Sequence, residues 1–181
     1  KTSGLCAAAR SLATPATTVV PRTQRKTAFH RDSPYEMLES ILNDLHDNMS
    51  NRFVTISGGE PFMYWDKGKT IFDLFAQFKD TYFLVYTNGT LLHKKNCDKL
   101  ATLGNVTPAI SIEGWKEQTD ERRGKGTHRK LLENIESLKA VGVPFGISST
   151  VTARNVEVFL NTDIYDYLFE ELGATYLWLF Q

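Results

Sequence analysis

The stretch "VTISGGEPFMYW", residues 54–65, decides the fold. An apolar run ends in two glycines, a glutamate and a proline, and then turns apolar again. Two glycines let a ligand approach bare backbone, and Pro61 fixes the chain after Glu60 and removes a backbone donor. Two interpretations stay open: Glu60 faces a cationic group such as an amine, or it starts a helix after a tight turn.

Around this stretch, helical and extended patterns alternate along the chain. Five strands are expected, at residues 52–57, 82–87, 106–113, 144–151 and 175–180. Helices are expected at residues 32–48, with Ser33 as N-cap, and at 68–80, 94–104, 128–142 and 155–173. Such alternation predicts an α/β protein with a parallel sheet, either an open doubly wound sheet or a (β/α) barrel. Both architectures place ligands at the carboxyl ends of the strands.

Those strand ends are rich in small and polar residues. Four of them read Ser57-Gly58-Gly59-Glu60-Pro61, Thr87-Asn88-Gly89-Thr90, Ser111-Ile112-Glu113-Gly114 and Ser148-Ser149-Thr150-Val151-Thr152. A polar segment with Arg122 and Arg123 follows the third strand. A planar guanidinium suits a carboxylate or phosphate, although a solvated basic loop would have the same composition.

Charge divides the chain into two parts. The whole sequence of 181 residues has 21 basic and 21 acidic side chains, which gives no basic excess for nucleic-acid binding. Residues 1–31 hold six of the basic residues and no acid, so residues 32–181 carry a formal charge of −6. We predict a disordered or non-native leader at 1–31 and a partial core domain at 32–181.

Composition also limits the setting of the protein. No run approaches 18 apolar residues, so no membrane span is expected. Two cysteines, Cys6 and Cys97, fit a reducing, cytoplasmic environment better than a disulfide scaffold. The sequence starts without methionine and ends on an apolar run, which we interpret as a fragment.

The order of the strand-end motifs resembles the radical S-adenosylmethionine (SAM) enzymes. "SGGEP", "YTNGT" and "SIEG…TDERRGKGT" follow three successive strands, and the similarity covers roughly residues 33–181. This resemblance implies a partial (β/α)6 TIM-like barrel of which strands two to six are present. It also implies SAM and a [4Fe-4S] cluster as cofactors, an electron donor, and 5′-deoxyadenosyl-radical chemistry on a substrate that the visible sequence does not identify.

The resemblance further implies cofactor-binding roles for individual residues, and no catalytic side chain. The segment Gly58, Gly59, Glu60 and Pro61 would hold the amino group of SAM. Ser111 and Glu113 would face its ribose or methionine part, Arg123 would pair with its carboxylate, and Asn88 and Ser149 would line the same rim.

One departure from the family concerns the cluster. The family takes its iron ligands from Cys-x3-Cys-x2-Cys after strand one. That loop should fall at about residues 5–25, where only Cys6 occurs, and no first strand is recognisable. We therefore expect no metal ligands and no radical chemistry from the chain as written.

Three interpretations stay open. The parent is an ordinary enzyme whose residues 1–31 are a wrongly read or truncated leader, or the chain is a degenerate, non-catalytic SAM-binding or scaffold module. The third is an unrelated α/β protein with similar strand ends.

Overall fold

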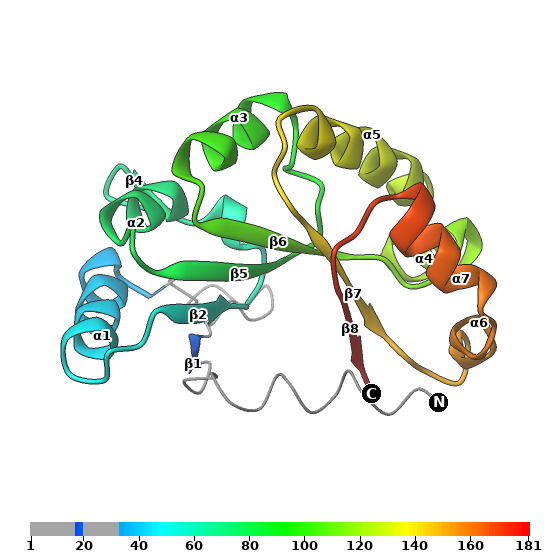
Figure 1. Ribbon diagram of the computed structural model, residues 1–181, viewed down its shortest axis with the longest axis horizontal. Helices are drawn as coiled ribbons and strands as arrows, with labels where there is room; N and C mark the ends of the chain where they lie inside the picture. The colour runs from blue at the N-terminus through cyan, green and yellow to red at the C-terminus, as the bar shows by residue number, and fades with distance from the viewer. Residues whose placement is uncertain (1–16, 20–32) are drawn as a thin grey trace.

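The computed structural model describes residues 17–19 and 33–181 and contains one large parallel sheet (Figure 1). Its strands are β1 (Thr17–Val19), β2 (Phe53–Ile56), β5 (Tyr82–Thr87), β6 (Val106–Ser111), β7 (Gly146–Thr150) and β8 (Leu177–Phe180). They lie side by side in this same order, and all five neighbouring pairs are parallel. A doubly wound sheet reverses its strand order at a switch point. The described strands do not, which confirms the barrel-type prediction.

The five predicted strands are confirmed, and one further strand of this sheet, β1, was not predicted. β1 pairs in parallel with β2, with Thr17 opposite Val54. A three-residue strand is too short to show a period of two, so periodicity could not indicate it. β1 falls inside the predicted leader, whose other residues lie outside the described part of the chain. The boundary at residue 31 therefore stays a prediction.

The helices cover the convex side of the curled sheet (Figure 1). They are α1 (Tyr35–Asp47), α2 (Ile71–Gln77), α3 (Lys94–Leu103), α4 (Lys116–Arg123), α5 (Thr127–Ala140), α6 (Val156–Leu160) and α7 (Asp163–Asp166). A 3-10 turn, η2 (Pro61–Met63), follows β2, and a π-helical turn, η3 (Tyr167–Glu171), extends α7. Fully buried apolar residues such as Phe75 and Phe83, with ring centroids 4.8 Å apart, fill the space between helices and sheet.

A small hairpin replaces the first turn of the helix predicted at 68–80. It consists of β3 (Trp65–Asp66) and β4 (Lys69–Thr70), which pair antiparallel. Lys67 and Gly68 between them both have positive φ, 49° and 84°, as a two-residue type I′ hairpin turn requires. α2 therefore starts only at Ile71.

The same hairpin corrects the prediction for the start of α1. Ser33 was predicted as N-cap, but α1 begins at Tyr35 with no side-chain cap from its own segment. Instead, the Tyr35 amide donates to Asp66 Oδ2 at 2.8 Å. A carboxylate 31 residues away thus satisfies a helix donor that we had assigned to a local cap.

The polar segment after β6 is also more regular than predicted. It contains the helix α4, of which only Thr119 is buried. Because α4 buries so little, its sequence shows no apolar stripe, and periodicity could not indicate it.

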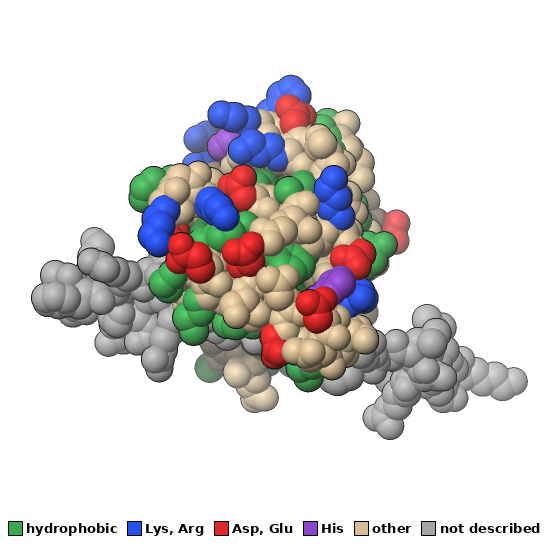
Figure 2. Space-filling model, turned by 90° about the vertical axis from the view of Figure 1, so that its left-hand side faces the viewer, with side chains coloured by type: hydrophobic (Ala, Val, Ile, Leu, Met, Phe, Trp, Pro, Cys, Tyr) green, Lys and Arg blue, Asp and Glu red, His purple; other side chains and the backbone are tan. Residues whose placement is uncertain are grey.

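No described helix is both long and apolar enough to cross a bilayer. Acidic and basic side chains share the face of the molecule shown in Figure 2.

Candidate functional site

A cavity of about 640 Å³ is lined by residues of β2, β5, β6, β7 and β8, of the segments after β2 and β5, and of α4. Its lining residues are Phe53, Thr55, Ser57, Gly58, Gly59, Tyr86, Thr87, Asn88, Ser111, Arg123, Ser148, Thr150, Trp178 and Phe180. Five of the nine predicted site residues are among them: Gly58, Gly59, Asn88, Ser111 and Arg123. Strand ends that are far apart in sequence therefore meet at one cavity, as the parallel arrangement predicted.

Glu60 lies beside this cavity and joins the ends of β2 and β5. Its Oε1 accepts hydrogen bonds from Thr87 Oγ1 at 2.7 Å and from the Phe62 amide at 3.2 Å. Its Oε2 accepts from the Asn88 amide at 2.7 Å. Burial raises the pKa of Glu60, and these three hydrogen bonds oppose the rise.

The geometry of Glu60 bears on both interpretations of the motif. Glu60 is the N-cap of η2, and Pro61 is the first residue of that turn and is buried, so the helix-start interpretation is confirmed. That Glu60 faces an amine stays a prediction. The preceding Gly58 has a φ of 154°, which favours glycine.

Asn88 turns its backbone to Glu60 and its side chain to the loop after β5. Its Oδ1 accepts from the amide and the hydroxyl of Thr90, at 2.9 and 2.7 Å. Both bonds orient the side-chain amide of Asn88, which lines the cavity.

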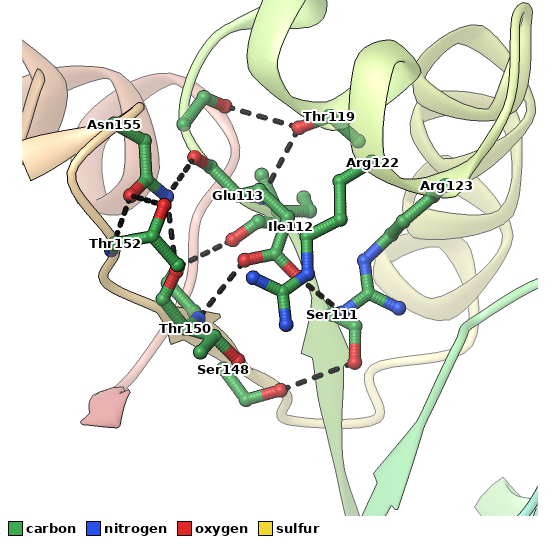
Figure 3. A network of polar contacts seen from close by, with 12 residues as sticks. Ser111, Ile112, Glu113, Thr119, Arg122, Arg123, Ser148, Thr150, Thr152 and Asn155 are labelled. Carbon is green, nitrogen blue, oxygen red and sulfur yellow. Dashed lines mark hydrogen bonds and ion pairs between the residues drawn. The ribbon is translucent and has the colours of Figure 1, made fainter. Parts of the chain in front are cut away.

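Glu113 and two arginines form a charged cluster on the opposite side (Figure 3). The Glu113 side chain is 1% exposed. Its Oε1 accepts from Arg123 Nη2 and lies 3.4 Å from Arg122 Nε, and its Oε2 accepts from the Thr150 amide at 2.9 Å. A buried carboxylate is stable only with such partners. Protein groups thus surround Glu113, which we had predicted to face the ribose or the methionine part.

Arg123 connects this cluster to the cavity. Resemblance to the family assigned Arg123 to a cofactor carboxylate, whereas the structure pairs it with Glu113. Its Nε is buried and has no hydrogen-bond partner among the described residues. A guanidinium offers five N–H donors, so Arg123 can bind Glu113 and still offer donors to an anion in the cavity.

Ser149 is not placed on the cavity. Its side chain is 1% exposed and donates to the Ile112 carbonyl. Successive side chains of a strand point to opposite faces, so Ser148 and Thr150 line the cavity instead. Ser148 Oγ lies 3.3 Å from Ser111 Oγ. A cofactor-binding role for Ser149 stays a prediction.

Two residues of this region were not predicted. Thr119 on α4 accepts a hydrogen bond from the Glu113 amide at 3.1 Å. Asn155 donates to the Glu113 carbonyl at 2.9 Å. In the sequence, a polar residue just before a helix predicts an N-cap. No local signal could therefore connect Asn155 to a strand end 42 residues earlier.

The described residues do not fit an iron–sulfur cluster. They contain no group of three or more His, Cys, Asp or Glu side chains that could hold a metal ion. Cys97 is buried on α3, its Sγ donates to the Leu92 carbonyl at 3.1 Å, and burial raises its pKa to about 11. A cluster ligand must be a thiolate, so Cys97 is unsuited to the role. Cys6 lies outside the described residues.

Comparison with known proteins identifies the class of this chain. The model of the radical SAM superfamily matches residues 6–158. The chain therefore belongs to the radical SAM superfamily, as the strand-end motifs predicted.

Individual relatives agree with this assignment. An AdoMet-dependent heme synthase of Methanosarcina barkeri (strain Fusaro / DSM 804) is 36% identical over 123 residues, which are 66% of this chain and 33% of that protein. The chain spans about a third of the length of the curated relatives it matches.

Two solved structures share the fold. SuiB of Streptococcus suis, bound to its precursor peptide SuiA, aligns with a TM-score of 0.70 at 21% identity over 91% of this chain and 39% of that one. Native anSMEcpe with bound AdoMet aligns with a TM-score of 0.69 at 19% identity over 92% of this chain and 51% of that one.

Proposed function

We propose that this chain is the SAM-binding core of a radical SAM enzyme and that the cavity at the strand ends holds SAM. The observation that carries the proposal is Arg123, which lines the cavity and keeps a buried Nε without a partner among the described residues. An unsatisfied guanidinium donor favours an anionic ligand group. The carboxylate of SAM is such a group.

The other polar groups of the ligand also have matching residues at the cavity. Gly58 and Gly59 offer backbone without side chains to the amino group, with Glu60 close behind them. Ser111 and Asn88 offer a hydroxyl and an amide to the remaining polar atoms. When bound in a complete enzyme, the superfamily's cofactors supply one-electron cleavage of a sulfonium and hydrogen abstraction from a substrate. The part of this chain is to bind and orient SAM.

The proposal is tested by calorimetric titration with SAM and with decarboxylated SAM. If Arg123 binds the carboxylate, the wild-type chain should prefer SAM by about tenfold or more, the effect of one charge-assisted hydrogen bond. Arg123→Lys should reduce that preference and leave the affinity for decarboxylated SAM nearly unchanged. Arg129→Lys on α5, a side chain 85% exposed, is the matched control. Failure of the wild-type chain to bind either ligand would contradict the proposal.

The cluster of the parent enzyme is a separate proposal. The sequence holds two cysteines without Cys-x3-Cys-x2-Cys spacing, so we propose that this chain alone does not assemble a four-iron cluster. Iron and sulfide analysis after anaerobic reconstitution should give fewer than four irons per chain. A stable cluster with four irons per chain would overturn this proposal.

The alternative function is a non-catalytic SAM-binding or scaffold module, which the same cysteine count favours. The two functions predict equal SAM binding and differ in reductive cleavage. Reductive cleavage of SAM by the reconstituted full-length protein would establish the enzyme. Binding without cleavage, in a full-length protein that holds iron, would establish the module.

The inner wall of the cavity suggests a substrate class for the parent. This wall is lined by the aromatic residues Phe53, Tyr86, Trp178 and Phe180. The rings of Tyr86 and Phe180 pack edge to face, with their centroids 5.4 Å apart. Flat aromatic side chains pack well against a planar apolar ligand. Together with the heme synthase relative, this wall favours a tetrapyrrole. Heme should quench tryptophan fluorescence, and Trp178→Leu should remove most of that quenching, whereas Trp65→Leu on the exposed hairpin should not.

A further inference from the structure

Asn155 lies between β7 and α6 and is 4% exposed. Its Nδ2 donates to the Glu113 carbonyl at 2.9 Å and to the Thr150 carbonyl at 3.0 Å. Its Oδ1 accepts from the amide and the hydroxyl of Thr152, at 2.7 and 3.1 Å. A carboxamide has two N–H donors and two acceptor positions, so all of its hydrogen-bonding capacity is used.

These bonds join the end of β6 to the end of β7 (Figure 3). One connects Asn155 to the backbone of Glu113, and another connects it to the backbone of Thr150. The Thr150 amide in turn donates to the Glu113 side chain. Main chain and side chain of Glu113 are therefore fixed by the same small network, in which Asn155 is the central amide.

Because Glu113 is held in place, it also restricts the position of Arg123 at the cavity. Its carboxylate accepts from Arg123 Nη2, and Arg123 lines the cavity, whereas Glu113 and Asn155 do not. A guanidinium on a long side chain has many rotamers, and a fixed partner selects one of them. The direction in which Arg123 presents its remaining donors thus depends on where Glu113 is held.

We propose that Asn155 is a positioning residue for ligand binding: it holds Glu113, and through Glu113 it aims the Arg123 guanidinium at the carboxylate of the ligand. This inference rests on the proposed function, because the aimed arginine has a role only if the cavity takes a carboxylate-bearing ligand. Asn155 itself touches no ligand in this scheme.

Asn155→Asp tests the proposal with almost no change in shape. The aspartate keeps an acceptor for Thr152 but replaces the donor to two carbonyl oxygens with a negatively charged oxygen. We expect about a tenfold loss of SAM affinity, the cost of a misplaced charge-assisted hydrogen bond. Affinity for decarboxylated SAM should change less than twofold, because that ligand does not use the arginine. General damage to the fold would lower the affinity for SAM and the affinity for decarboxylated SAM by similar factors.

Asn161→Asp is the matched control. Asn161 lies in the exposed link between α6 and α7, where its Oδ1 accepts from the Asp163 amide at 3.0 Å. The substitution makes the same chemical change away from the cavity, and both affinities should stay unchanged. If Asn155→Asp fails to fold, Asn155→Ser, which is neutral and smaller, replaces it with the same expected selectivity.

The outcomes separate the inference from the proposed function. Equal losses for both ligands, or no loss, in a folded Asn155 variant would overturn the inference. A wild-type chain that binds neither ligand would overturn the proposed function instead. The inference is then decided by the NMR resonance of Arg123 Nε–Hε, assigned by its absence in Arg123→Lys. That resonance should move in Asn155→Asp, and an unmoved resonance would overturn the inference.

Discussion

Two glutamates at the ends of parallel strands, Glu60 and Glu113, are held in opposite ways. Glu60 follows β2 and, among the described residues, accepts only from neutral groups: two backbone amides and one hydroxyl. Glu113 follows β6, is almost fully buried, and pairs with two guanidinium groups. Their positions relative to the strands are similar, so the difference comes from what the neighbouring elements bring to each.

The two sides of the cavity, one formed by β2 and β5 and the other by β6 and β7, therefore differ in the ligand groups they can bind. The side of β2 and β5 is a neutral, hydrogen-bonded frame, in which a carboxylate fixes loop geometry. On the side of β6 and β7, charge is concentrated, and a carboxylate there holds a cation in place. A ligand carboxylate would match the second side, where the Arg123 guanidinium lines the cavity.

The largest expected effect is that of Glu113→Gln. The substitution keeps the shape but leaves Arg122 and Arg123 without their counter-charge. Breaking a buried ion pair costs about 3–5 kcal/mol, and both arginines are partly exposed to water, at 43% and 23% of their side chains. We therefore expect a loss of about 3 kcal/mol in the free energy of unfolding, measured with urea. A smaller loss than that of Glu60→Gln would contradict the contrast between the two sites.

Gly89→Ala should come next and concerns the neutral side. Gly89 follows Asn88 with a φ of 73°, and an added Cβ would lie 2.7 Å from Leu131 Cδ2 and 2.8 Å from Ile110 Cγ2. We expect about 2–3 kcal/mol of destabilisation from strain and overpacking. Gly104→Ala is the control, because Gly104 has a φ of 71° and no atom of the described residues lies within 4 Å of its Cβ position. It should cost about 1 kcal/mol by the same measurement, and equal costs would disprove the overlap.

Glu60→Gln should cost about 1 kcal/mol, the price of one unmade hydrogen bond. Since burial raises the pKa of Glu60 above its ordinary value of 4.5, the folded chain keeps a proton that the unfolded chain has released. The contribution of Glu60 to stability therefore falls as pH rises from 4.5 through the raised pKa.

The quantity to measure is the difference in unfolding free energy between wild type and Glu60→Gln, by urea titration at several values of pH. It should shrink as pH rises through that window. A difference that grows with pH would show that the pKa is lowered and that the hydrogen bonds outweigh burial.

The smallest expected effect is the difference in stability between alanine variants of two neighbouring serines of β7. Ser149→Ala removes the hydroxyl that donates to the Ile112 carbonyl and should cost about 1 kcal/mol. Ser148→Ala, on the cavity side, should change stability by less than about 0.5 kcal/mol but should weaken SAM binding. Urea unfolding and calorimetry on both variants check this pair, and the reverse assignment would show that the strand's faces are exchanged.

Much of the fold was predictable because its signals are local. Apolar runs marked five strands, and Gly104, Gly142 and Gly173 marked helix ends, where each has a positive φ of 70° to 81°. β1 and α4 were not predicted because they lack such local signals. β1 is too short for a period, and α4 buries too little of its surface to show one.

The sequence by itself determined which residues stand at the strand ends. In a parallel sheet, the order along the chain places every carboxyl end on one edge, so Gly58, Asn88, Ser111 and their neighbours had to meet. The tertiary structure alone decided their partners. Arg123 turned to Glu113, Asp66 capped a helix that begins 31 residues earlier, and Asn155 joined two strand ends. Hydrogen bonds and ion pairs depend on distances in space, which folding sets between residues that the chain keeps far apart.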